Sequence, residues 1–451
     1  MPATTLDEIY KFCLNKPLNQ QELTKLYVAD SNEIRGLDFV KRLIREFRRT
    51  ESGSFMKAYL MGQHGVGKTT ELVRLTTLLS PTHQTIWVNG DEDLHPVFFE
   101  SFDILYLIMI KVVEETQRET HKLPSHNVLE QLRTFFLSQA SKDIRNLLDN
   151  AGLVDPESKS ENQWIKWAVI FNEMKGQIKF PVGRTESYIK FQLTHISSLV
   201  ELTNQILGEC EQLLTKENGK HWFFVFDGFE KAGVAIKNIQ LFFLTSPNIL
   251  QELNTNWIFT TPLILGYTEA RKFQLPLYLI RPIPVFNRKL DRHPMGHQVL
   301  RQILESRVNL SLFESGQVER LITASGGNLR DLFDLVKESS LIAITERSNS
   351  ISISEFDVTK AISKLRNNFL DRLGEDQSEL TPVPYPEKAN KLTQIYRCNP
   401  DSKIPDKVFW SLLKTGVIQD FFDSDYWFGV HPLVVDILAE QGRVTLPGHL
   451  T

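Results

Sequence analysis

The 451-residue sequence has few cysteines, little net charge and no long apolar run. Its three cysteines, Cys13, Cys210 and Cys398, are far apart and odd in number. They fit neither a disulfide framework nor a zinc cluster, which indicates a reducing compartment. The longest apolar stretch, residues 104–113, is interrupted by Lys111 and is half the roughly 20 residues that a membrane span needs. The amino terminus lacks the apolar segment of a secretory signal, so we expect a cytoplasmic protein with no membrane partner.

The net charge of the chain is also small. The 51 Lys and Arg residues against 55 Asp and Glu leave a formal net charge of −4. This balance argues against a protein whose main role is to coat nucleic acid or an anionic membrane, although a local basic patch is compatible with it. No HExxH, paired-cysteine or G-x-S-x-G pattern occurs, so we predict no structural metal and no serine-hydrolase elbow.

Five short apolar runs carry the β-strand signal. Each is rich in β-branched or aromatic residues and is continuously apolar, as strands buried on both faces of a parallel sheet are. They end at Met61, Asn89, Phe226, Thr261 and Phe286. Helical patterns lie between them, so the predicted fold class is α/β, with a parallel five-stranded sheet.

The spacing of the runs predicts the domain organisation. About 130 residues of helical character separate the second run from the third, which indicates a helical insertion beside the sheet. The predicted parts are an amino-terminal helical arm at 1–50, a core at 51–286 with the insertion at about 100–220, a helical lid at 287–373, a proline-containing linker at 374–390 and a winged-helix-like domain at 391–451.

One eight-residue loop decides the class of chemistry. It follows the first strand, precedes a helical pattern that starts with Thr70, and matches G-x-x-x-x-G-K-[ST] in full. Its residues are Gly62, Gln63, His64, Gly65, Val66, Gly67, Lys68 and Thr69. The glycines let backbone N–H groups point at phosphate oxygens, and the following helix adds its dipole. Lys68 supplies a point charge for the β- and γ-phosphates, and the Thr69 hydroxyl is a ligand for Mg²⁺.

The remaining catalytic candidates follow later strands. Asp227 ends the third strand, where an α/β sheet places its ligands, and is the second predicted Mg²⁺ residue. Gly228 stands where many such ATPases carry a glutamate, so Glu230 is the candidate for orienting water and slow hydrolysis is expected. Thr260 or its neighbour Thr261 is a second candidate for placing that water. Arg330, which follows a Gly-Gly-Asn-Leu run, would reach the γ-phosphate from the lid.

These residues resemble the AAA+ and STAND branch of P-loop ATPases, especially bacterial ATP-binding proteins. GQHGVGKTTEL is similar to Walker A, FFVFDGFEK to Walker B, FTTP to the sensor-1 strand and GGNLRDLF to the sensor-2 helix. The segment around Arg35 and Gly36 resembles the adenine-side linker, and WFGVHPLVVDIL resembles a terminal winged helix. The resemblance implies ATP and Mg²⁺ as cofactors, bound by Arg35, Gly36, the loop and Thr70. It also implies a homo-oligomer, whose arginine finger would be Arg271, Arg281 or Arg288.

Three functions stay open. The leading hypothesis is a Mg²⁺-dependent ATP switch that acts through a separate effector or sensor protein, in bacterial signalling or antiphage defence. A DNA-associated AAA+ ATPase of the origin-binding or transposition-regulator type ranks second, because the segment 391–440 carries five Lys and Arg against seven Asp and Glu. The third is a scaffold that binds nucleotide without turnover.

Overall fold

This protein, which we describe from a computed structural model, contains a five-stranded sheet. Its strands are β1 (Lys57–Gly62), β2 (His83–Asn89), β3 (His221–Asp227), β4 (Asn256–Thr260) and β5 (Leu277–Ile280). Their order is β2-β3-β4-β1-β5, and the pairs β2–β3, β3–β4 and β4–β1 are parallel. The residues described are 2–36, 38–50, 53–95, 99–138, 163–181, 184–229, 247–268, 275–347, 350–375, 382–423 and 425–446.

Burial explains why these segments are strands. β3 is buried continuously from Trp222 to Asp227, so both of its faces are covered, as its unbroken apolar run predicts. The predicted α/β class with a parallel five-stranded sheet is confirmed. The fifth strand was expected to extend to Phe286, but β5 ends at Ile280. Pro282 and Pro284 follow, and because proline has no N–H to donate to a ladder, the sheet cannot continue through them.

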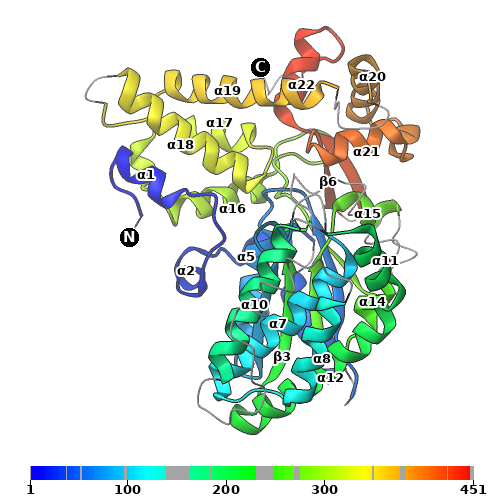
Figure 1. Ribbon diagram of the computed structural model, residues 1–451. Coiled ribbons are helices and arrows are strands. Elements are labelled where there is room, and N and C mark those ends of the chain that lie inside the picture. Colours follow the sequence, from blue (N-terminus) through cyan, green and yellow to red (C-terminus); the bar gives the residue numbers. More distant parts are fainter. Residues whose placement is uncertain are drawn as a thin grey trace. The chain divides into compact units, whose positions relative to one another are not determined.

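The chain divides into two units, and the first comprises residues 46–60 and 76–277. Its helices are α6 (Gly90–Asp93), α7 (Ser101–Thr120), α8 (His126–Leu137), α10 (Gln163–Lys179), α11 (Glu186–Thr194), α12 (Ile196–Asn218), α14 (Pro247–Gln251) and α15 (Leu263–Thr268). The predicted insertion is therefore helical, and α7 packs against α12 and β2 (Figure 1). No helix in the described ranges is long and apolar enough to cross a membrane.

The second unit comprises residues 1–45, 61–75 and 278–451. Its amino-terminal helices are α1 (Leu6–Phe12), α2 (Gln20–Leu26), α3 (Asp30–Ile34) and the start of α4 (Phe39–Phe47), and α5 (Lys68–Leu79) begins in it. Four α-helices occupy the predicted lid: α16 (Pro294–Glu305), α17 (Gln317–Ala324), α18 (Leu329–Glu346) and α19 (Glu355–Leu373), with a 3₁₀ turn at Leu310–Leu312. α1 packs on α18, and α18 lies beside α19 (Figure 1).

The carboxyl-terminal segment of this unit is a small helix-and-hairpin array. It consists of α20 (Tyr385–Tyr396), a 3₁₀ turn (Pro400–Lys403), α21 (Lys407–Lys414), β6 (Ile418–Asp423), β7 (Asp425–Val430) and α22 (Pro432–Glu440). The predicted hairpin is present, since β6 and β7 pair antiparallel. The linker predicted at 374–390 is too long, because α20 already begins at Tyr385. Pro386, read as a linker residue, occupies the first turn of α20, where its missing N–H costs nothing.

Candidate phosphate-binding site

The loop between β1 and α5 has the backbone conformation that its glycines permit. Gly65 and Gly67 have φ of +87° and +99°, a region that residues with a Cβ rarely adopt. At Gly62, a Cβ would stand 2.6 Å from the carbonyl oxygen of Ile280 at the end of β5. α5 begins at Lys68, so the N–H groups and the positive dipole end of this helix are presented at the loop.

Two buried cations hold this loop. Lys68 is 6% exposed, and its Nζ donates to the carbonyl oxygens of Gly62 at 2.9 Å and of Gln63 at 3.1 Å. Arg35 is also 6% exposed, and its Nη2 donates to the carbonyl oxygen of Val66 at 2.9 Å. Burial lowers the pKa of the Arg35 guanidinium, which reflects the cost of keeping a charge away from water. Positive charge is therefore concentrated where the sequence predicts phosphates.

The amino-terminal end of α18 contacts the other side of the loop. The side chain of Asn328 caps α18 by accepting from the backbone N–H of Arg330, and its Nδ2 donates to the His64 carbonyl oxygen at 2.7 Å. A Cβ on Gly65 would stand 2.3 Å from Asn328 Oδ1 and 2.7 Å from Arg330 Cβ. The backbone of Arg330, the predicted sensor arginine, therefore lies directly against the loop. The side chain of His64 is exposed, as expected.

The hairpin β6–β7 makes a third contact with the loop. Gln63 is 7% exposed, and its Nε2 donates to the Ile418 carbonyl oxygen at 2.6 Å. Nearby, Arg281 Nε pairs with Asp420 Oδ1 at 3.2 Å, and its guanidinium lies 4.9 Å from the ring centroid of Tyr426. The ion pair is buried, since the two side chains are 9% and 2% exposed. The guanidinium of Arg281 is therefore held within this chain, which disfavours the arginine-finger role considered for it.

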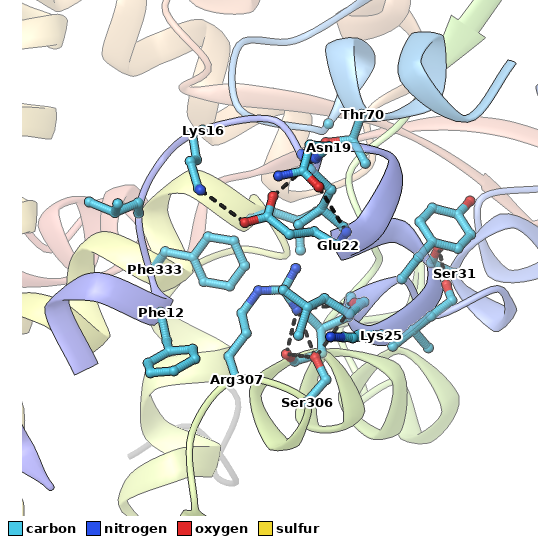
Figure 2. Close-up of a pocket in the computed structure, with 18 of the residues that line it drawn as sticks. Phe12, Lys16, Asn19, Glu22, Lys25, Ser31, Thr70, Ser306, Arg307 and Phe333 are labelled. Carbon is cyan, nitrogen blue, oxygen red and sulfur yellow. Dashed lines mark hydrogen bonds and ion pairs between the residues drawn. The ribbon is translucent and has the colours of Figure 1, made fainter. Parts of the chain in front are cut away.

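A cavity of about 780 Å³ opens beside the loop and the first turn of α5 (Figure 2). Its walls come from α5, the amino-terminal arm and the lid. The lining includes Gly67, Thr70 and Glu71 on the α5 side, Leu26, Tyr27, Val28, Ser31 and Arg35 on the arm, and Ile303, Arg307, Leu329 and Phe333 on the lid. This size and mixed lining are typical of pockets for small organic ligands.

A polar network fixes the α5 wall of this cavity. The hydroxyl of Tyr27 donates to Glu71 Oε1 at 2.6 Å and accepts from Asn32 Nδ2 at 2.6 Å. Arg74 donates to Asp38 Oδ2 at 2.9 Å and to Glu71 Oε2 at 3.1 Å. Burial, followed by the charge of Glu71, raises the pKa of Tyr27, so its phenol stays protonated as a donor. The arm is thereby anchored to the helix that follows the loop.

In the other unit, the predicted acid and threonine lie at neighbouring strand ends. The register pairs Phe226 of β3 with Phe259 of β4, so Asp227 and Thr260 are the next residues on adjacent strands. Asp227 is 4% exposed and Thr260 is fully buried. The hydroxyl of Thr261 is buried and has no hydrogen-bond partner among the described residues. Of the two threonines considered for placing the water, Thr261 is therefore favoured, because its hydroxyl is available for a further hydrogen bond.

The predicted site residues therefore fall into three groups. Lys68, the rest of the loop, Arg35, Gly36 and Arg330 lie in one unit, and Asp227 and Thr260 lie together in the other. Glu230 and Arg271 lie outside the described residues. The roles assigned to these side chains stay predictions.

The sequence interpretation gave no role to Asn328, Tyr27 or Arg307. The position of Asn328 can be predicted from the sequence, because asparagine after a glycine pair and before an apolar run favours a helix N-cap. No sequence pattern identifies Tyr27 or Arg307, since their importance depends on which distant segments face the cavity.

Comparison with known proteins gives no family. No protein-family model and no curated protein matches the chain. Similar solved structures include Cdc6p from Pyrobaculum aerophilum, with 12% identity and a TM-score of 0.40 over 96% of this chain and 99% of that one. The Orc1 protein of Aeropyrum pernix in complex with DNA has 13% identity and a TM-score of 0.41 over 98% of both chains. A Walker-type ATPase of Pyrococcus abyssi has 13% identity and a TM-score of 0.41 over 95% and 99%. Likeness at this level carries no inference about what this chain binds.

Proposed function

We propose that this chain is a Mg²⁺-dependent ATP-binding switch that hydrolyses ATP slowly. The observation that carries the proposal is the loop at 62–69, whose sequence, positive-φ glycines and buried Lys68 at the start of α5 would suit a phosphate cradle. The cavity beside it, lined by Thr70 and Arg35, offers space for the nucleoside. Phosphates and nucleoside would then occupy adjoining parts of the same unit.

Each predicted residue has a physical role in this proposal. Lys68 and the loop N–H groups would hold the phosphates, and Thr69 with Asp227 would hold Mg²⁺, which neutralises charge that develops on the transferred phosphoryl group. Arg330 would stabilise the γ-phosphate from α18. Glu230 and a threonine at the end of β4 would orient the attacking water.

The contacts of the loop support a switch rather than a simple hydrolase. Asn328 joins the loop to α18, and Gln63 joins it to β6, so a ligand that moves the loop would change both contacts. Two discrete arrangements of such elements are what a nucleotide-dependent switch requires. We infer that α18 and the carboxyl-terminal segment, the latter proposed as a winged helix, transmit the nucleotide state to a partner protein. The STAND-like resemblance favours bacterial signalling or antiphage defence as the setting.

ATP turnover with and without duplex DNA tests this function. Wild type, Lys68→Ala and Glu230→Gln should be compared at equal fold stability. The proposal predicts slow turnover in wild type, none in Lys68→Ala, strongly reduced turnover in Glu230→Gln, and no effect of DNA. Equal turnover in wild type and Lys68→Ala would contradict the enzyme, and strong stimulation by DNA that fades with salt would favour the DNA-associated ATPase. ATP binding without turnover would favour the scaffold.

A further inference from the structure

The lid side of the cavity carries a buried arginine, Arg307. It follows α16, and its backbone carbonyl accepts from the N–H of Ala3 at 2.8 Å. Its Nη1 donates to the carbonyl oxygens of Leu26 at 3.2 Å and Ile303 at 2.8 Å, and to Ser306 Oγ at 2.8 Å. Figure 2 shows its guanidinium among the lining side chains, between Phe333 and Ser306. The residue is 6% exposed, so this cation faces little besides the cavity.

The guanidinium is incompletely satisfied. Among the described residues, Nε and Nη2 have no hydrogen-bond partner and no carboxylate lies within ion-pair distance, although the charge of Glu22, which lines the same cavity, acts on the guanidinium. Burial lowers the pKa of Arg307 to about 10, so it remains a cation at neutral pH. A buried charge with open donor positions is unfavourable unless another group supplies acceptors. The remaining donors face the cavity, where a ligand atom or water can accept from them.

The position of Arg307 defines which part of a nucleotide it meets. Leu329 Cδ1 would lie 3.7 Å from a Cβ on Gly67, so Leu329 touches the loop. Phe333 follows one helical turn later on α18, and the Arg307 guanidinium lies 5.0 Å from its ring centroid. With about 5.4 Å for the turn, these separations place the guanidinium at most roughly 14 Å from the loop. Gly67, Thr70 and Arg307 line the same cavity, so a nucleotide whose phosphates occupy the loop can extend its base to this guanidinium.

We propose that Arg307 is a base-binding residue whose Nε and Nη2 hydrogens donate to the N7 edge of a purine. This inference rests on the proposed nucleotide binding. A guanidinium has donors only, so it selects a base that presents acceptors. Both purines carry an acceptor at N7, whereas the pyrimidines have no N7. Guanine adds the acceptor O6 and can accept from both donors, but adenine carries the N6 amino donor beside N7 and can accept from only one of them. Leu26, Ile303 and Leu329 supply apolar surface for the ring.

Binding of 7-deaza nucleotides to the full chain tests this contact without a mutation. Dissociation constants should be measured for ATP, 7-deaza-ATP, GTP and 7-deaza-GTP. A hydrogen bond from a charged donor predicts that removing N7 from the preferred purine weakens binding to wild type about 10- to 100-fold. Which of ATP and GTP binds tighter shows whether the pocket is built for adenine or guanine. Equal binding of each purine nucleotide and its 7-deaza analogue overturns the inference.

Variants then assign the loss to Arg307. In Arg307→Met the parent nucleotide should bind as weakly as its 7-deaza analogue binds wild type, and the two should differ by less than about twofold. Arg301→Met is the matched control, because Arg301 is a half-exposed arginine of α16 paired with Glu305 that does not line the cavity. It should keep the full 7-deaza effect. A folded wild type that binds no purine nucleotide contradicts the proposed function itself, whereas ATP binding with no 7-deaza effect contradicts only the role of Arg307.

Discussion

Replacement of Gly65 by alanine tests whether the loop and α18 form one structure. The substitution acts in two ways. The backbone has φ of +87°, where a residue with a Cβ is strained by roughly 1–2 kcal/mol. The new methyl group would also stand 2.3 Å from Asn328 Oδ1 and 2.7 Å from Arg330 Cβ, and overpacking of this kind costs about 1–3 kcal/mol. We expect a total loss of about 2–5 kcal/mol in the free energy of unfolding of this unit, measured by urea denaturation.

Gly316, in the same unit, provides a matched control for this experiment. It has φ of +80°, but no atom lies within 4 Å of where its Cβ would be, so Gly316→Ala should show the backbone strain alone. Combining Gly65→Ala with Asn328→Ala should cost less than the sum of the two single changes, because the second removes the closest clashing atom. Equal losses for Gly65→Ala and Gly316→Ala, with additive double-variant energies, would refute the contact between the loop and α18.

Three further predictions concern buried polar groups. Arg281→Met removes the buried ion-pair partner of Asp420 and should lower stability by about 3–5 kcal/mol. Arg301→Met removes partly exposed pairs with Glu305 and Glu319 and should cost less than about 1 kcal/mol in the same urea assay. Gln63→Ala leaves a buried carbonyl of β6 unsatisfied and should cost about 1–3 kcal/mol, with faster hydrogen exchange in β6; unchanged exchange there would contradict the contact. Burial raises the pKa of Asp331 to about 6 from 3.8, so its contribution is complete below pH 3.8 and is lost as the pH rises through 6. Asp331→Asn should therefore gain roughly 2–3 kcal/mol relative to wild type between pH 4 and pH 7, and parallel stability profiles would contradict this.

Local sequence patterns predicted the elements well. The continuous apolar run at 222–226 predicted a strand buried on both faces, and β3 is such a strand. The G-x-x-x-x-G-K-T spacing predicted a strand, a loop and a helix in that order, which are β1, the loop and α5. The predicted length of the fifth strand was wrong for a local reason, since Pro282 and Pro284 interrupt the apolar run that predicted it. These successes and this failure all depend on residues close in sequence.

The surroundings of the loop could not be predicted in the same way. The hydrogen bond from Gln63 to Ile418 joins residues 355 positions apart, and no periodicity connects them. The cavity is lined by Tyr27, Arg307 and Phe333, which come from three separate segments. A buried arginine without a carboxylate partner is visible only once the fold shows what surrounds it. The motif therefore predicted where the phosphates of a ligand would bind, and the tertiary structure was needed to locate the pocket proposed for the rest of that ligand.

The central claim is that the loop at 62–69 binds the phosphates of a nucleotide through Lys68. Its most direct test is a calorimetric titration of wild type and Lys68→Ala with ATP and Mg²⁺, with urea denaturation to show that both are folded. Wild type should bind one ATP per chain, and Lys68→Ala should bind at least about tenfold more weakly, because a charge-assisted contact to phosphate is removed. Equal ATP affinity in the two folded proteins, or no binding to wild type, would contradict the account.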